Sequence, residues 1–122
     1  MAYEIPGFAL GTRVAAADLS SSQFKFVKLA ADNKVALAGA GELALGVLQD
    51  KPIAGESANV MVNGTSKVVA GDTIVEGAIV AADAAGDAVT ATAGAWGLGL
   101  ALNGAADGDI VEVQLVNLGL QV

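Results

Sequence analysis

Apolar and polar residues alternate along much of this chain, with a spacing of two. In segment 57–63, Ala58, Val60 and Val62 fall on one face, and mostly polar residues fall on the other. Segment 109–117 shows the same alternation. A period of two is typical of a strand with one buried face. Glycine also interrupts the Ala-rich stretches after Gly39 too often for long helices, so we expect an all-β fold.

Further strands are predicted between the glycine-rich turns, at 25–29, 34–38, 43–49, 65–70, 78–82, 88–91 and 96–102. Asn63-Gly64 stands between segments 57–63 and 65–70. This pair predicts a tight hairpin, because a type I′ turn needs positive φ at both central residues. Segment 18–22 begins with Asp18 and predicts a single capped helical turn.

The second half of the chain resembles the first when the sequence is shifted by 53 residues. The shift places Val27 on Val80, Gly41 on Gly94, Gly55 on Gly108 and Val60 on Val113. We interpret 27–62 and 80–115 as two similar β units within one domain, 14–122, that forms a small β-sandwich or β-barrel. Val60 and Val113 should then both be buried, and Asn59 and Glu112 should both be exposed.

The opening segment, 1–13, fits neither unit. It holds several bulky residues in a chain that has few, and Pro6-Gly7 excludes a regular helix there. The segment could be a first strand that pairs into the sheet. We favour the alternative, an extended N-terminal arm that docks on a partner by adding a strand or filling pockets. The residues expected to make this contact are Tyr3, Ile5, Pro6 and Phe8.

Charge and composition exclude several classes of function. The net charge is −7, and the six basic residues are scattered singly, so neither nucleic-acid binding nor a basic membrane-binding helix is expected. The chain has no Cys and no His, which removes the disulfide framework, the thiol nucleophile and the commonest general base. No signal peptide is recognised at the N-terminus, so we expect a soluble protein that is made in a reducing cytoplasm and keeps its N-terminus.

The remaining candidates for chemistry are weak. A Ser-Lys dyad is conceivable from Ser20–Ser22 or Ser66, but no spacing indicates one. Gly39-Ala40-Gly41-Glu42 lacks the Lys and the hydroxyl residue of a phosphate-binding loop. The turn Asp107-Gly108-Asp109 has too few oxygen ligands for a calcium loop. We therefore expect no catalytic residue, no metal and no cofactor. Trp96 is either a core anchor or a subunit contact, and we carry it forward as the candidate oligomer interface.

Several stretches nonetheless have a family likeness. They are Met1 to Gly7, Gln23 to Val27, Gly39 to Glu42, Leu45 to Gln49, Ala54 to Glu56, and Lys67 to Gly71. In order and spacing they resemble the small capsid decoration (cement) proteins of tailed bacteriophages. The resemblance covers nearly the whole chain, although no single motif is diagnostic.

The resemblance implies a β-rich homotrimer without catalytic residues. Such a protein binds the major capsid protein at threefold and quasi-threefold sites on the outer capsid surface of the virion, and stabilises the expanded head. One alternative is another virion or cell-surface binding module, such as a head fibre base or an adhesin. A second alternative, a nucleotide-dependent recombination factor, lacks the phosphate-binding residues and has the wrong charge.

Overall fold

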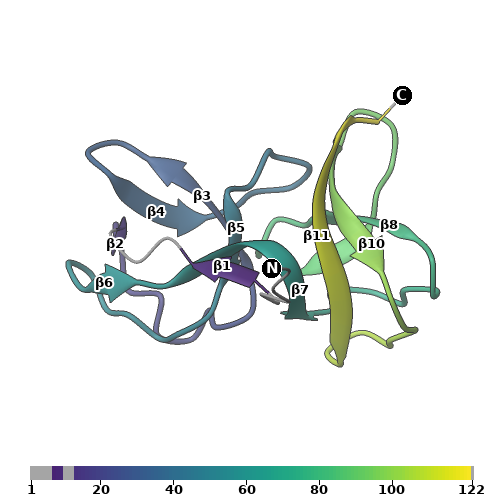
Figure 1. Cartoon of the computed structure of the whole chain (residues 1–122), viewed down its shortest axis with the longest axis horizontal. Helices are drawn as coiled ribbons and strands as arrows, with labels where there is room; N and C mark the ends of the chain where they lie inside the picture. Colours follow the sequence, from purple (N-terminus) through teal and green to yellow (C-terminus); the bar gives the residue numbers. More distant parts are fainter. Residues whose placement is uncertain (1–6, 10–12, 122) are drawn as a thin grey trace, which may run out of the picture.

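The structure is a computed structural model that describes residues 7–9 and 13–121. This part of the chain is all-β and contains no helix (Figure 1). Its strands, in chain order, are β1 (Gly7–Ala9), β2 (Arg13–Ala15), β3 (Phe26–Ala30), β4 (Lys34–Leu37), β5 (Gly46–Leu48), β6 (Ser57–Ala58), β7 (Val60–Val69), β8 (Ile79–Ala82), β9 (Ala88–Thr90), β10 (Trp96–Ala101) and β11 (Ile110–Leu120).

The first part of the sheet closes on itself as a small barrel. The strand order is β6-β2-β4-β3-β5-β7, in which β2 and β4 are parallel and the other neighbours are antiparallel. Only Asn59 separates β6 from β7. The first and last strands of this path are therefore almost one continuous strand, and the sheet has no open edge there.

The rest of the sheet forms a second barrel that shares β7 with the first. The order continues β7-β11-β10-β8-β9, with antiparallel pairs throughout. Ala70, directly after β7, then forms a parallel bridge with Ala88 in β9 and closes the ring. Figure 1 shows the two barrels as separate lobes, with β2 to β6 in one and β8 to β11 in the other.

The strand registers of the two barrels are the same when 53 is added to each residue number. Val27 pairs with Leu37 and with Gly46, and its counterpart Val80 pairs with Thr90 and with Gly99. The pair Leu48–Val60 likewise becomes Ala101–Val113. Identical registers over three strand pairs are far more specific than the sequence likeness between the halves. The chain thus contains one barrel design twice.

The first strand of each barrel also has a counterpart in the other barrel, but here 55 must be added to the residue number instead of 53. Ala15 pairs in parallel with Val35, and Ala70 bridges in parallel to Ala88. In the same way, the Leu19 amide donates to the Pro52 carbonyl, and the Ile74 amide to the Ala105 carbonyl. The first barrel therefore has two more residues between Leu19 and β3 than the second has at the matching place. The end of β7 starts the second barrel as β2 starts the first.

The hydrophobic interior repeats in the same way. The smaller core cluster consists of Ala15, Leu19, Val27, Val35, Leu48, Ala58 and Val60. Each member has a counterpart in the larger cluster: Ala70, Ile74, Val80, Ala88, Ala101, Val111 and Val113. Val60 and Val113 are fully buried, and Asn59 and Glu112 are exposed, as the shift of 53 residues predicted.

The other members of the larger cluster join the two barrels. Phe26, Ala38 and Val47 come from the first barrel, and Val68, Ala82, Leu98 and Leu115 from the second. Phe26 is fully buried, whereas its counterpart Ile79 is only partly buried. The difference arises because the second barrel covers the face of the first that carries Phe26, and no further barrel covers Ile79.

Polar contacts reinforce this junction between the barrels. The amide of Phe26 donates to the carbonyl of Gly86 (2.8 Å), and the amide of Gly41 donates to the carbonyl of Ala82 (2.9 Å). The ammonium of Lys25 lies 3.3 Å from the carboxylate of Asp87, and both side chains are mostly buried. Backbone bonds and a shielded ion pair fix the relative orientation of the barrels better than apolar contact alone would.

Two local predictions from the sequence are wrong. Asn63-Gly64 forms no hairpin, because β7 continues through this pair without interruption from Val60 to Val69. Positive φ occurs at Gly64 (97°) but not at Asn63, so a type I′ turn cannot form. Segment 18–22 forms no helical turn either. Its Asp18 carboxylate instead accepts a hydrogen bond from the Ser20 amide (3.0 Å), which closes a local turn. Hydrogen bonding to the Ser20 side chain, and then to its amide, lowers the pKa of Asp18.

Part of the predicted N-terminal arm is a strand. Within segment 1–13, β1 pairs with β7 in antiparallel fashion, Gly7 opposite Gly64 and Ala9 opposite Met61. Arg13 begins β2. The described residues of this segment thus lie along the edge of β6 and β7, in line with the alternative of a first strand. Residues 1–6 and 10–12 lie outside the described part of the chain.

Candidate interaction surface

Two polar side chains that could have a chemical role, those of Ser66 and Asp83, are engaged in structural hydrogen bonds. Ser66 is buried, and its hydroxyl contacts the Gln49 side-chain amide (3.0 Å) and the Lys67 carbonyl (3.0 Å). The Asp83 carboxylate accepts the amides of Ala85 and Asp87 and so holds the turn before β9. In residues 13–121, acidic side chains do not gather in groups of three or more that could hold a metal ion.

The described residues also include no helix long and apolar enough to cross a membrane. Three features differ from an ordinary polar surface: an ion pair inside a loop of the first barrel, an open pocket at the matching loop of the second, and an apolar region at the junction of the barrels.

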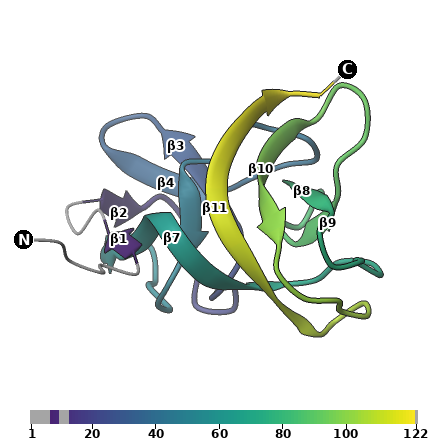
Figure 2. The same ribbon diagram turned by 45° about the vertical axis from the view of Figure 1, so that its right-hand side comes forward.

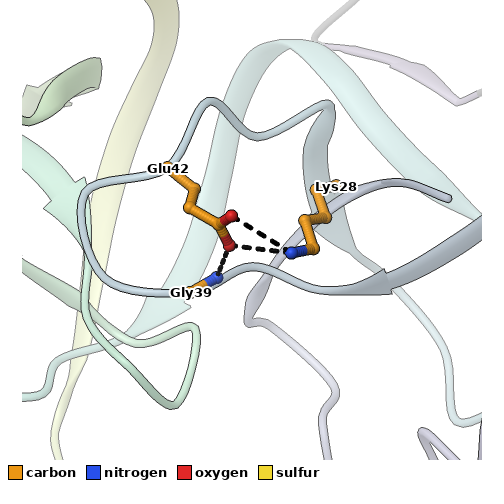
Figure 3. Close-up of polar contacts among 3 residues, drawn as sticks. All are labelled: Lys28, Gly39 and Glu42. Atoms are coloured by element: carbon orange, nitrogen blue, oxygen red, sulfur yellow. Dashed lines mark hydrogen bonds and ion pairs between the residues drawn. The ribbon is translucent and has the colours of Figure 1, made fainter.

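The ion pair lies between β3 and the loop that follows β4. Figure 3 shows the carboxylate of Glu42 between the ammonium of Lys28 and the amide of Gly39. The distances are 2.9 and 3.2 Å from Lys28 Nζ to the two carboxylate oxygens, and 2.6 Å from Gly39 N to Oε1. The hydrogen bond to Lys28, and then that to Gly39, lower the pKa of Glu42. The carboxylate therefore stays charged at neutral pH.

Glycine at position 39 is required for this arrangement. A Cβ atom there would lie 2.5 Å from Oε1 of Glu42, closer than real Cβ contacts allow. The absence of a side chain at residue 39 leaves room for the carboxylate to approach the backbone amide this closely. The side chains of Lys28 and Glu42 meet in the space beside the loop (Figure 3).

The matching loop of the second barrel borders an open pocket instead, and Ala40 and Gly41 of the first barrel complete its lining. The counterparts of Lys28, Gly39 and Glu42 are Ala81, Thr92 and Ala95, and all of them line a pocket of about 510 Å³. The loop backbone is the same in both barrels. Glu42 N donates to Gly39 O (3.2 Å) as Ala95 N donates to Thr92 O (3.1 Å), and Gly41 and Gly94 both have positive φ.

The apolar region lies where the barrels meet. A small cavity of about 60 Å³ opens between them, lined largely by Phe26, Leu45, Val62, Leu98, Leu115 and Val116. Beside it, a shallower hollow of about 370 Å³ is lined by Leu29, Leu43 and Leu45, with Lys28 and Asn117 at its polar positions. Leu29 and Leu43 are exposed, which is unusual for adjacent large apolar residues on a free monomer.

The C-terminal end of β11 extends this apolar character. The last pair between β11 and β7 is Leu115–Gly64, so among residues 7–9 and 13–121 the part of β11 beyond Leu115 pairs only with β10. Val116, Leu118 and Leu120 are exposed along this part of the strand. An exposed strand with an unpaired edge and apolar side chains is suited to binding another protein.

The structure describes only some of the contact residues predicted from the sequence. Tyr3, Ile5 and Pro6 lie outside the described residues, and Phe8 is placed by its backbone alone, opposite Asn63 in β7. Trp96 opens β10, pairs with Leu120 and packs, partly buried, against the larger core cluster. In Figure 2, β1 and the C-terminal end lie on opposite sides of the molecule, so Trp96 and β1 do not form one surface.

Sequence reasoning missed the open pocket and the ion pair that corresponds to it. The signal was available, because the shift of 53 residues aligns Lys28 with Ala81 and Glu42 with Ala95. A pair of opposite charges aligned with a pair of alanines suggests space in one copy that is filled in the other. Matching residues were instead used only to support the repeat.

Comparisons with known proteins add one finding. No protein-family model matches the sequence, and no curated protein matches it significantly. The fold is similar to the crystal structure of the N base of the head fiber gp8.5 in bacteriophage phi29, with a TM-score of 0.69. The match covers 95% of this chain and 98% of that chain, at 16% sequence identity. At this identity the likeness establishes a shared fold over nearly the whole length of both chains.

Proposed function

We propose that this protein is a structural component of a bacteriophage head that binds to the outer surface of the capsid and has no catalytic activity. The observation that carries the proposal is the fold match, which spans 95% of this chain and 98% of a phage head fiber base. A likeness over nearly the whole of both chains supports a shared role more strongly than the likeness of a common subdomain would, although fold alone does not fix function.

The surface of the molecule supports a binding role. The side chains Leu29, Leu43, Val116, Leu118 and Leu120 are exposed large hydrophobics at or near the junction of the barrels. Burying each on a partner would contribute up to about 1.5–3 kcal/mol. The net charge of −7 opposes contact with the DNA inside a head, and therefore favours a position on the outside.

Within this proposal, the role of a fibre base is the first candidate, because the fold match is to such a base. The second is the role of a decoration protein at threefold and quasi-threefold capsid sites, which the sequence resemblance to cement proteins favours. The two differ in whether the protein carries a further fibre or acts by itself. In both cases we propose the major capsid protein as the partner, and a homotrimer whose contacts include Trp96.

Co-sedimentation with heads tests the proposal. Heads assembled without this protein should be mixed with the purified chain and pelleted, and the bound chain in the pellet should be measured. The control is the same experiment with phage DNA in place of heads. We expect saturable binding to heads and none to DNA. A chain that stays in the supernatant with heads at any concentration would contradict the proposal. Sedimentation of the free chain should give a mass of about three chains, and a monomer both free and bound would exclude the trimer.

A further inference from the structure

The two corresponding loops of the repeat differ in what lies beside them, an ion pair in the first barrel and an open pocket in the second. In the first barrel, the ammonium of Lys28 and the carboxylate of Glu42 fill the space beside the loop (Figure 3). In the second barrel, Ala81 and Ala95 stand in their places and the pocket is open. Both alanines are buried beneath the pocket. The fold therefore provides one copy of the site with its own occupant and one without.

The open pocket has a defined chemistry. Asp72 and Asp83 are the charged residues of its lining, and no Lys or Arg of the described chain joins them. Thr90 and Thr92 add further polar groups, while the buried floor consists of small apolar residues. Negative charge at the rim over an apolar floor suits a side chain with a long hydrocarbon stem and a positive end.

We infer that the pocket of the second barrel is a socket for a lysine or arginine side chain on the capsid protein. This inference rests on the proposed function, since it names the contact through which the protein binds. The first barrel supports it directly, because the corresponding space there holds the side chain of Lys28. A carboxylate is a poor occupant, since Asp72 and Asp83 would repel it.

The first barrel also shows how to close the socket. The triple substitution A81K/T92G/A95E would install the ion pair found at Lys28, Gly39 and Glu42. Thr92→Gly is needed because a Cβ atom at the matching residue, Gly39, would collide with the carboxylate. The control is K34A/E76A, because it also leaves the net charge unchanged and both residues are exposed outside the lining of the socket.

The experiment measures binding of each folded variant to heads, with circular dichroism and the urea midpoint as checks on folding. We expect the triple variant to lose at least about tenfold in affinity, and K34A/E76A to bind like the original chain. A folded triple variant with unchanged affinity would overturn the inference. If the original chain itself fails to bind heads, it is the proposed function that fails.

A second variant decides the matter if the triple variant does not fold. Asp72 is exposed, and one of its side-chain oxygens accepts the Thr73 amide (2.8 Å), a bond that asparagine can keep. Asp72→Asn should weaken binding several-fold at low salt and reduce the salt dependence of the affinity, because one charge of the contact is removed. Equal affinity and equal salt dependence in Asp72→Asn and the original chain would overturn the inference.

Discussion

Gly86 provides a sharp test of how closely the two barrels pack. It has φ of 78°, and a Cβ atom there would lie 2.8 Å from Cδ1 of Leu37 and 2.9 Å from the carbonyl oxygen of Phe26. Both neighbours belong to the first barrel. The Leu37 side chain could move aside, but the Phe26 carbonyl is backbone within a paired strand. Gly86→Ala should therefore push the barrels apart.

Gly108 is the matched control. It has φ of 88°, but nothing lies within 4 Å of the position that its Cβ would take. Gly108→Ala should thus cost only the left-handed conformation, about 1–2 kcal/mol. Gly86→Ala adds the cost of overpacking, about 1–3 kcal/mol, for a total of about 2–5 kcal/mol. Against a folding stability of about 5–15 kcal/mol, the difference is readily measured.

Urea unfolding of the original chain and both variants, followed by circular dichroism, gives the two free-energy changes. We expect Gly86→Ala to lose clearly more stability than Gly108→Ala. Gly86→Asn should also be costly. Its counterpart in the first barrel, Asn33, tolerates φ of 64° because no further barrel packs against the turn that contains Asn33. Equal losses for Gly86→Ala and Gly108→Ala would refute the close packing of the barrels.

Three further predictions concern the core, the ion pair and the N-terminal segment. Phe26→Ala should cost about 3–5 kcal/mol in urea unfolding, and the partly buried Ile79→Ala clearly less; equal costs would contradict the proposed role of Phe26 between the barrels. The pKa of Glu42 is lowered, so its ion pair stabilises the fold above the ordinary glutamate pKa of about 4.3 and is lost as the pH falls through the lower folded value. The stability difference between the original chain and Glu42→Gln, measured by urea unfolding, should therefore shrink between pH 7 and pH 2, and a constant difference would exclude this contribution. Deletion of residues 2–9 removes β1, which lies off the main path of the sheet, so the circular dichroism spectrum should stay that of a folded β protein while binding to heads is abolished; normal binding, or failure to fold, would exclude a docking role for this segment.

The alternation of apolar and polar residues, together with the glycine-rich turns, was sufficient to predict most of the strands. Segments 34–38, 78–82, 88–91 and 96–102 each match an observed strand within a residue or two. The glycine-rich turns between the segments located these strands as much as alternation did, because β8 and β10 are buried along most of their length and show no period of two in burial. The shift of 53 residues also located corresponding strands, because both copies bury the same positions.

Features that depend on distant contacts could not be predicted in this way. Asn63-Gly64 has the local signal for a hairpin. By continuing as one strand through this pair, however, β7 pairs with β5 before it and with β11 from Gly64 onward. The pairing of Gly7–Ala9 with β7 is likewise non-local. The pocket beside Ala81 and Ala95 exists because these side chains are smaller than their counterparts, Lys28 and Glu42. The sequence shows this difference only when the two copies are compared residue by residue.

The central claim is that this two-barrel protein binds the outer surface of a phage head. Cryo-electron microscopy of heads incubated with the purified chain, beside heads without it, tests the claim most directly. We predict additional density of two-barrel shape on the outer surface, at defined positions of the capsid lattice. Heads whose outer surface is identical with and without the chain would contradict the claim.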